Sequence, residues 1–473
     1  MIIYFSLFLS FALGNPHNGM TFFNSTFEQT KSGTFLINNN YTKINYWKHE
    51  ERAIGIPYLF RDGSIISQFI NNNHYFHNAH GPIGGIFKKL SWGGDIIWDF
   101  TFYNNNINPH HDFVVMPNGN LLILSWEKKS LIEAQMKGRV NISDEIWSLA
   151  IFEINPVQND SSNIVWEWHL WDHLIQDIDP ELDDFGSINE NPQRLNINIG
   201  DHFSSDWLHT NSIDYNSTLD QIIFSSRNLN EIYIIDHSTT TEEAIGSMGG
   251  NSGKGGDILF RWGNPYNYDR GQISDRVLGS QHGVNWIEDS FPGSGQIIIF
   301  NNNPSDTIGP TGLNGNSSVI QINPCLDSNG NYMIETNSPF LLYEQKLIDG
   351  GDHSFFSNFQ SGAYRLENGN TLISVTQEKR VFEVDTTGDI TWEFFLSNLI
   401  NSVGYSARAR KYNLNYIDIL IGDIYMDNFI NIYDLIKTID HKIDNQYSNK
   451  IDFNGDGQID NNDIYGMIDL IFN

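Results

Sequence analysis

Short apolar runs separated by turns make up most of the chain between residues 20 and 410. In one recurring pattern, a turn that contains Gly precedes an apolar run; it occurs at residues 62–66, 118–123, 295–299 and 368–373. Glycine readily adopts the positive φ that a tight hairpin requires, and each run has the length of a buried strand. The pattern therefore predicts β-hairpins rather than helices.

A second pattern consists of a turn, a short aliphatic or β-branched run and a tryptophan. It ends at Trp98, Trp166, Trp262 and Trp392, and it alternates with the first pattern along the chain. Each unit is therefore expected to contain several antiparallel strands and an aromatic side chain that packs on the next unit. Repetition of small sheets around an axis is the way in which β-propellers avoid exposed sheet edges.

We therefore predict an all-β fold, a six-bladed β-propeller over residues 20–415. Five units can be recognised, and the N-terminal strands around 33–48 are expected to complete a sixth with residues after Tyr405. A β-helix or a pair of β-sandwiches is the alternative. The irregular spacing of the patterns predicts loop insertions near residues 130–160, 176–206 and 303–340.

The pattern changes after Leu420, where two acidic loops are each followed by an amphipathic stretch. The loops begin at Asp423 and Asp452, 29 positions apart, and the second has Gly457 at the position where calcium loops turn sharply. The expected calcium ligands are Asp452, Asn454, Asp456, Gln458, Asp460 and Asp463 in the second loop, and Asp423, Asp427, Phe429, Asn431 and Asp434 in the first. We therefore predict a small α-helical, calcium-binding domain over residues 420–473.

The first 14 residues form an apolar stretch that is too short to span a bilayer and ends in a small-residue cleavage pattern at Ala12–Gly14. We interpret residues 1–14 as a signal peptide, with a buried N-terminal strand as the alternative. No later segment is apolar enough to span a membrane. The mature protein is thus expected to be secreted, either extracellular, at the cell surface or in a periplasm.

Composition excludes some classes of partner. The chain has 57 acidic and 27 basic side chains, a net charge of −30, which argues against nucleic acid or an anionic membrane as partner. Because Cys325 is the only cysteine, the fold cannot depend on an intramolecular disulfide.

The candidate chemistry lies in histidines that begin strand patterns in successive units. His111, His209 and His282 each precede such a pattern, so a propeller would bring them together at its axis. Arg227 follows His209 by 18 positions, a distance that suits a strand and its return. A nearby Arg disfavours zinc and favours a tetrahedral oxyanion, and a metal-free His can act as a nucleophile.

Two points stay open at this stage. His110 adjoins His111, so either one could be the site residue. In the cluster at 166–173, His169 and His173 are interpreted as structural or supporting, with Asp172 as a candidate partner for a ring nitrogen.

These residues resemble the site of the PAPS-independent arylsulfate sulfotransferases. The resemblance rests on His209-x-Asn211, on Arg227 within Ser-Ser-Arg, on His282 within Gln-His and on His111 upstream, and it covers roughly residues 45–410. It implies a six-bladed propeller that transfers a sulfuryl group from a phenolic sulfate to a phenol by a ping-pong mechanism. By the same resemblance, His282 is the nucleophile that becomes sulfated, Arg227, His209 and Asn211 hold the sulfuryl oxygens, and His111 is the acid/base.

The C-terminal loops, which end in Asp rather than Glu, resemble a type I dockerin. That resemblance implies two loop–helix repeats and a partner-binding face, usually for a cohesin domain; attachment to the cell surface is equally consistent with the sequence. We expect calcium but no organic cofactor. The competing hypothesis for the large domain is a non-catalytic propeller that binds carbohydrate or protein ligands, and a metal-dependent hydrolase is a more distant one.

Overall fold

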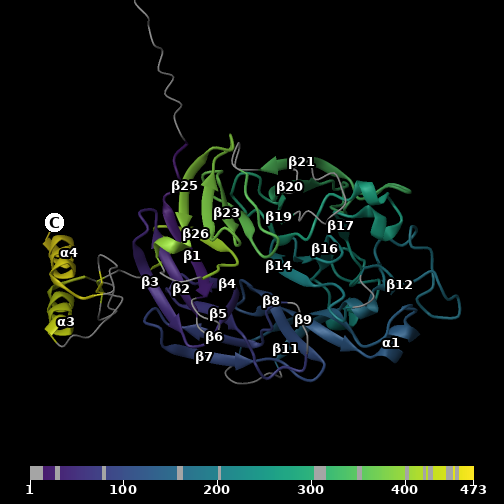
Figure 1. Cartoon of the computed structure of the whole chain (residues 1–473), viewed down its shortest axis with the longest axis horizontal. Coiled ribbons are helices and arrows are strands. Elements are labelled where there is room, and N and C mark those ends of the chain that lie inside the picture. Colours follow the sequence, from purple (N-terminus) through teal and green to yellow (C-terminus); the bar gives the residue numbers. More distant parts are fainter. Residues whose placement is uncertain are drawn as a thin grey trace, which may run out of the picture.

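The computed structural model describes residues 14–26, 32–76, 81–156, 163–200, 204–302, 316–348, 354–399, 404–418, 422–423, 430–443, 451–452 and 458–472. Within them, six four-stranded antiparallel sheets follow one another around the molecule as the blades of a β-propeller (Figure 1). This confirms the predicted fold of the large domain.

The first three blades contain strands from the N-terminal part of the chain. Blade 1 comprises β26 (Ala409–Asn413), β1 (Gly19–Thr26), β2 (Ser32–Asn38) and β3 (Lys43–His49), in that order. Blade 2 comprises β4 (Ala53–Leu59), β5 (Ile65–Phe69), β6 (Ile86–Leu90) and β7 (Ile96–Thr101). Blade 3 comprises β8 (Ile107–Val115), β9 (Leu121–Lys129), β10 (Ile146–Ile154) and β11 (Ile164–His169).

The other three blades follow in the same manner. Blade 4 comprises β14 (Thr210–Asn216), β15 (Gln221–Ser226), β16 (Glu231–Asp236) and β17 (Phe260–Trp262). Blade 5 comprises β18 (His282–Trp286), β19 (Ile297–Asn301), β20 (Ser318–Pro324) and β21 (Leu342–Ile348). Blade 6 comprises β22 (Gly362–Arg365), β23 (Thr371–Val375), β24 (Arg380–Val384) and β25 (Ile390–Phe395).

Shorter elements lie in the connections within and between the blades. They are α1 (Leu131–Met136), α2 (Thr241–Ala244), the parallel pair β12 (Leu174–Ile175) and β13 (Leu195–Asn196), and the 3-10 turns Leu170–Asp172, Pro265–Tyr268, Ile273–Asp275 and Leu396–Asn398. The insertion predicted near 176–206 is confirmed as an irregular segment. The insertions predicted near 130–160 and 303–340 are partly wrong, because they contain β10 and β20. All nine residues of β10 are buried, so the strand lacks the alternation that would reveal it.

Each of the two sequence patterns corresponds to one place in a blade. The Gly-turn pattern forms the second strand, as in β5, β9, β19 and β23, and the tryptophan pattern forms the outermost strand, as in β7, β11, β17 and β25. The tryptophans pack on the next blade: Trp166 shares a core cluster with Phe224 of blade 4, and Trp392 shares one with Phe23 and Phe35 of blade 1. Burial between successive blades therefore holds the ring together.

The ring is closed by strands from both ends of the chain. β26 pairs antiparallel with β1, with Met20 opposite Tyr412 and Phe23 opposite Ala409. The prediction that residues after Tyr405 complete the sixth blade is confirmed. The strand that pairs with them is β1, which begins before the predicted 33–48.

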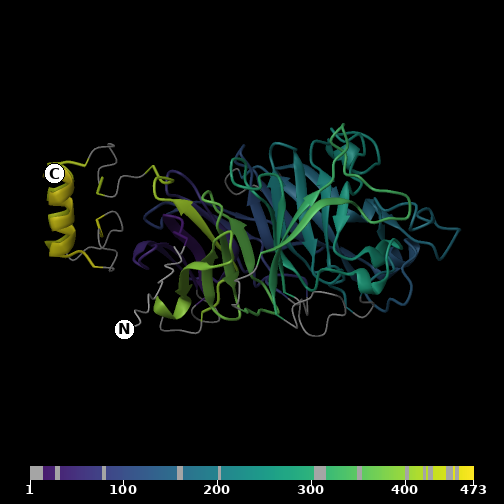
Figure 2. The same cartoon turned by 90° about the horizontal axis from the view of Figure 1, so that it is seen from above.

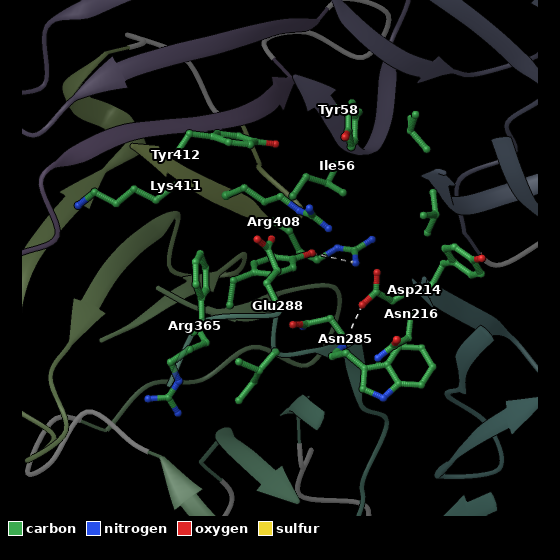
Figure 3. Close-up of a pocket in the computed structure, with 18 of the residues that line it drawn as sticks. Ile56, Tyr58, Asp214, Asn216, Asn285, Glu288, Arg365, Arg408, Lys411 and Tyr412 are labelled. Atoms are coloured by element: carbon green, nitrogen blue, oxygen red, sulfur yellow. Dashed lines mark hydrogen bonds between the residues drawn. The ribbon is translucent and has the colours of Figure 1, made fainter. Parts of the chain in front are cut away.

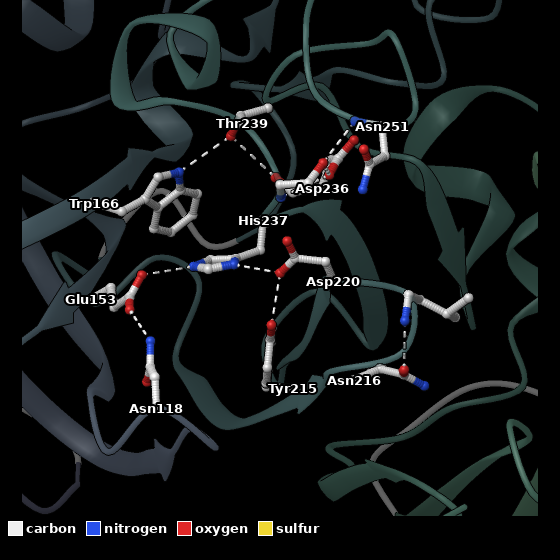
Figure 4. Close-up of polar contacts among 12 residues, drawn as sticks. Asn118, Glu153, Trp166, Tyr215, Asn216, Asp220, Asp236, His237, Thr239 and Asn251 are labelled. Carbon is white, nitrogen blue, oxygen red and sulfur yellow. Dashed lines mark hydrogen bonds and ion pairs between the residues drawn. The ribbon is translucent and has the colours of Figure 1, made fainter.

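Blades 3 and 4 are also joined by a buried polar network (Figure 4). His237 lies between Glu153, at 3.1 Å, and Asp220, at 2.7 Å, and the Tyr215 hydroxyl donates to the same Asp220 oxygen. Burial acts to lower the pKa of His237, but its hydrogen bonds with Glu153 and Asp220 outweigh burial and raise the pKa above 6.5. Both ring nitrogens of His237 thus face carboxylates, Glu153 of blade 3 on one side and Asp220 of blade 4 on the other.

The C-terminal segment contains two helices, α3 (Ile432–Ile443) and α4 (Asn461–Phe472), which lie side by side (Figures 1 and 2). They begin 29 positions apart, and both begin in the same way. The backbone N–H of Asn431 donates to Asp434, and that of Asp460 donates to Asp463. The predicted repeat is therefore real at the helix starts.

Candidate functional site

The candidate site lies where the innermost strands begin, and the backbone there is irregular in four neighbouring blades. The register with the second strand shifts between Ile54 and Tyr58, Pro109 and Phe113, Thr210 and Ser212, and His282 and Asn285. His111 and His209 have φ values of 54° and 46°, in the left-handed region that side chains rarely adopt. Such bulges re-aim side chains and are frequent beside functional sites.

His282 is held by two acceptors on one ring nitrogen. Its Nδ1 lies 2.8 Å from the Asn302 Oδ1 and 3.0 Å from the Ser280 carbonyl oxygen. Because both partners only accept, Nδ1 carries the proton and Nε2 has a free electron pair. Burial, together with the nearby Arg227, lowers the pKa of His282 to about 3, so the ring is neutral at physiological pH.

His209 has a carboxylate partner instead. Its Nδ1 lies 2.6 Å from Asp206, whose other oxygen accepts a hydrogen bond of 3.0 Å from the Trp126 indole. Asp206 is buried and therefore fixes the ring orientation of His209.

The structure separates His111 from His110. His111 lines a small cavity together with Asn211 and His282, and its ring centre lies 4.7 Å from that of His209. His110 does not line the cavity; its ring stacks on Trp126 with centres 4.1 Å apart. The Nδ1 atoms of the two histidines are 2.8 Å apart, so one donates to the other.

The direction of that hydrogen bond follows from burial. The Nε2 of His110 is buried and has no hydrogen-bond partner among the described residues. A buried acceptor without a partner is less costly than a buried N–H without one. His110 is therefore the Nδ1 donor, and His111 presents its Nε2–H. Burial, with neighbouring positive charge as a smaller cause, holds the pKa of His111 well below 6.5.

Asn211 and Arg227 complete the predicted set. Asn211 lines the cavity; one of its two amide N–H groups donates to the Gln281 carbonyl at 2.8 Å, and its oxygen accepts from the Ser212 hydroxyl at 3.4 Å. The backbone N–H of Arg227 donates to the His209 carbonyl at 3.2 Å, and a guanidinium nitrogen donates to Asn228 at 3.1 Å. The charge of Arg227 acts on His282, as its effect on the pKa shows.

Sequence reasoning missed Arg408, Asp206 and Asn302. Arg408 lines the same cavity and forms a buried ion pair of 2.7 Å with Asp112. Arg408 directly precedes β26, a segment that the sequence predicted only to complete the ring. The one available signal in the sequence is the alternation of Arg408 and Arg410 with the small residues Ala407 and Ala409. The cavity itself has a volume of about 20 Å³, so a sulfuryl group would require the lining loops at Pro82 and Gln360 to move.

The 166–173 cluster has a packing role. His173 is fully buried; its Nδ1 lies 2.9 Å from Asp257 and its Nε2 2.8 Å from the Ala244 carbonyl. The predicted partner, Asp172, is therefore wrong for His173, because the adjacent blade supplies the carboxylate. His169 lies on the blade surface, 3.2 Å from Glu127, which supports a structural role.

The predicted calcium ligands lie in segments that the structure describes only in part. Asn454, Asp456, Asp427 and Phe429 lie outside the described residues. Within the described ranges, no three His, Cys, Asp or Glu side chains are arranged as ligands of one metal ion. Calcium binding stays a prediction from the sequence.

Comparisons with solved structures found distant likenesses. Solved structures that are similar include a protein of unknown function from Bacteroides caccae, with 10% identity, a TM-score of 0.43 and coverage of 83% of this chain and 98% of that chain. A periplasmic gluconolactonase from Pseudomonas aeruginosa has 8% identity, a TM-score of 0.37 and coverage of 83% and 99%. These likenesses are too distant to carry a functional argument. No curated protein sequence matches the chain.

A family model provides the assignment that these structures do not. The model described as Arylsulfotransferase (ASST) matches residues 17–374, a span that includes five of the six blades almost completely and His111, His209, Asn211, Arg227 and His282. The match covers well over half of the chain. The chain belongs to the arylsulfotransferase family.

Proposed function

We propose that this arylsulfotransferase moves a sulfuryl group from a phenolic sulfate ester to a phenol through a sulfohistidine at His282. The observation that carries the proposal is the pair of acceptors, Asn302 and the Ser280 carbonyl, on the Nδ1 of His282. They leave Nε2 unprotonated on a ring that faces a cavity shared with His111 and Asn211. A nucleophile needs such a free electron pair.

In the first half-reaction, the His282 Nε2 attacks sulfur, and an N–S bond forms while the bond from sulfur to the phenolic oxygen breaks. The charge on the sulfuryl oxygens is met by Arg227, by His209 with its Asp206 partner and by the Asn211 amide. Fixed donors placed where charge develops are the main source of catalysis in transfers of this kind. The first product is the phenol released from the donor.

In the second half-reaction, an acceptor phenol attacks the sulfohistidine and the N–S bond breaks. His111 takes up a proton from solution when the ester binds and, as the imidazolium, gives it to the departing phenolate in the first half; in the second half the phenolic proton passes to the neutral ring. A sulfate ester in the cavity brings negative charge next to His111 and raises its pKa from the low value of the empty site. His111 can then alternate between acid and base.

The direct test uses 4-nitrophenyl sulfate as donor and phenol as acceptor with the full chain. His282→Ala is expected to release nitrophenolate at least about a hundredfold more slowly than the wild type. His441→Ala, in α3, is the matched control and should leave the rate unchanged. Equal rates for His282→Ala and the wild type would contradict the mechanism. If the wild type shows no release with any phenol, the non-catalytic binding hypothesis is favoured instead.

We also propose that the C-terminal segment is a calcium-binding, dockerin-like domain that attaches the enzyme to a cohesin-like partner or to a cell surface. The equivalent starts of α3 and α4 support two loop–helix repeats. Asp434 and Asp463, at the last loop positions, lie at these helix starts, where calcium loops place their final carboxylate.

We propose further that residues 1–14 direct secretion. Residues 1–13 lie outside the described part of the chain. Among the residues that the structure describes, no helix is both long and apolar enough to cross a membrane. N-terminal sequencing of protein recovered from the medium or the periplasm would test the proposal by showing whether the chain begins after Gly14.

A further inference from the structure

The axis of the propeller holds a second, much larger cavity. It has a volume of about 500 Å³ and is lined by the innermost strands of all six blades (Figure 3). Pro117, Ser217 and Glu367, in the turns between first and second strands, surround its mouth. The ion pair of Arg408 with Asp112 lies between this axial cavity and the candidate site, and only Arg408 lines both cavities.

Alternate residues of β26 face the axial cavity. Side chains of a strand point alternately to opposite faces, so Arg410 and Tyr412 share the channel face with Arg408, which directly precedes the strand. Lys411 also lines the cavity, but its ammonium group extends into blade 6. Lys411 is neutralised there by Glu383, at 2.7 Å. Arg408 has Asp112 at the same distance. The middle residue, Arg410, is the exception.

No hydrogen bond or ion pair joins the Arg410 side chain to another described residue. Its Nε is buried without a partner, and the guanidinium packs over the Tyr364 ring, 4.9 Å from the ring centre. A buried N–H without an acceptor is costly, and the fork of N–H groups on a guanidinium suits a planar carboxylate. The hydroxyl of Tyr412, two residues on, is likewise buried and without a partner in the described structure.

The other residues that line the axial cavity limit the shape and the charge of a ligand. Tyr58, Trp286 and Ile56 supply flat or apolar surface. Asp214 also faces the cavity, where it accepts a hydrogen bond of 2.9 Å from the Trp286 backbone, and Glu288 and Asp289 are exposed towards the mouth. These carboxylates repel a ligand with two negative charges but permit a single charge that reaches Arg410.

We propose that the axial cavity is a second ligand site, in which Arg410 and Tyr412 hold the carboxylate of a small aromatic monoanion. The carboxylate accepts from the guanidinium and from the Tyr412 hydroxyl, and the ring of the ligand packs on Tyr58 and Trp286. The site is independent of sulfuryl transfer, because His282 and the residues that position it lie on the other side of the Arg408–Asp112 pair.

Calorimetric titration of the full chain with benzoate tests the proposal. Arg410→Gln is expected to weaken benzoate binding about tenfold or more, and Arg410→Lys, which keeps the charge, less than that. Asp214→Asn removes the competing carboxylate and is expected to tighten binding. Benzyl alcohol, which lacks the charge, and phthalate, which has two, should both bind more weakly than benzoate. Melting curves show whether each variant is folded.

His282→Ala and inorganic sulfate are the controls that distinguish the two cavities. His282→Ala and saturating inorganic sulfate should leave benzoate binding unchanged, which distinguishes this site from the candidate active site. The proposal is overturned if wild-type protein does not bind benzoate at millimolar concentration. It is also overturned if folded Arg410→Gln and Arg410→Lys bind as the wild type does, or if His282→Ala abolishes binding.

Discussion

His209 and His282 occupy comparable places in neighbouring blades but differ in the partner of their Nδ1 atoms. A buried carboxylate holds His209, whereas neutral oxygens of Asn302 and Ser280 hold His282. The carboxylate fixes the orientation of the His209 ring, and the two neutral acceptors leave the Nε2 of His282 unprotonated. We attribute the different roles of the two rings, oxyanion contact and nucleophile, to this difference.

Asn302→Asp tests that attribution. A carboxylate at Nδ1 should raise the pKa of His282 from about 3 by about 1–3 units, so that protons compete for Nε2 in mildly acidic solution. We expect kcat/KM of the variant to fall more steeply than that of the wild type as the pH is lowered from about 8 to 5. Asn301→Asp is the matched control, because Asn301 bonds the Gly279 N–H instead. Parallel pH profiles for Asn302→Asp and wild type would refute the attribution.

His111 is tested by the basicity of the departing phenol. A poor leaving group needs a proton, whereas 4-nitrophenolate needs little help. His111→Ala should therefore slow the reaction of phenyl sulfate about a hundredfold and that of 4-nitrophenyl sulfate much less. His441→Ala, in α3, is the control. A similar loss with both donors would show that His111 positions the substrate rather than transferring a proton.

The sequence was sufficient to predict that His111, His209 and His282 lie together, because each precedes a strand pattern and innermost strands meet at the axis. In the structure His282 begins β18 and His209 directly precedes β14, whereas His111 lies at the bulge within β8. The sequence could not assign Asp206, Asn302 or Arg408. Their contacts depend on bulges in the strands and on the distance between blades. The spacing of residues along the sequence reveals neither of these. The choice of His111 over His110 likewise required the left-handed turn at His111.

At the scale of elements, the turn and tryptophan patterns predicted the second and fourth strands of most blades. The innermost strands were harder to predict because bulges interrupt their alternation in four blades. β10 was missed because burial on both faces removes alternation altogether. Contacts between blades, such as the network around His237, connect positions that are 84 residues apart and have no local signal.

His237→Gln tests the contribution of that network to stability. The substitution leaves Glu153 and Asp220 without the imidazole ring between them. Because Asp220 is 35% exposed, we expect a loss of about 2–3 kcal/mol, less than for a fully buried pair. Tyr215→Phe removes one hydrogen bond to Asp220 and should cost about 1 kcal/mol. Urea unfolding measures both, and an unchanged midpoint for His237→Gln would contradict the proposed ion network.

At the scale of the whole molecule, the charge of −30 repels a sulfate ester, so the overall field cannot guide substrate to the site. The positive groups must act locally. Arg227 and Arg408 lie at the candidate site, and Arg410 lies in the axial cavity. The C-terminal segment 423–473 carries 10 Asp and 3 Lys, so calcium would neutralise part of the densest charge.

Calcium binding by this segment can be measured by titration of the metal-free chain. Asp463→Asn is expected to weaken binding at one site at least about tenfold, since it removes the last carboxylate of the second loop. Asp469→Asn, outside the predicted ligands, should leave the titration unchanged. Chelation should lower the helical signal of α3 and α4 without unfolding the propeller. Absence of binding at millimolar calcium would refute the predicted calcium domain.

The central claim is that His282 becomes covalently sulfated, and intact mass spectrometry tests it most directly. The protein is mixed with 4-nitrophenyl sulfate in the absence of an acceptor and quenched without acid. We predict a mass increase of one sulfuryl group, located on the peptide that contains His282, lost on addition of phenol and absent from His282→Ala. Turnover without any adduct, or an identical adduct in His282→Ala, would contradict the account.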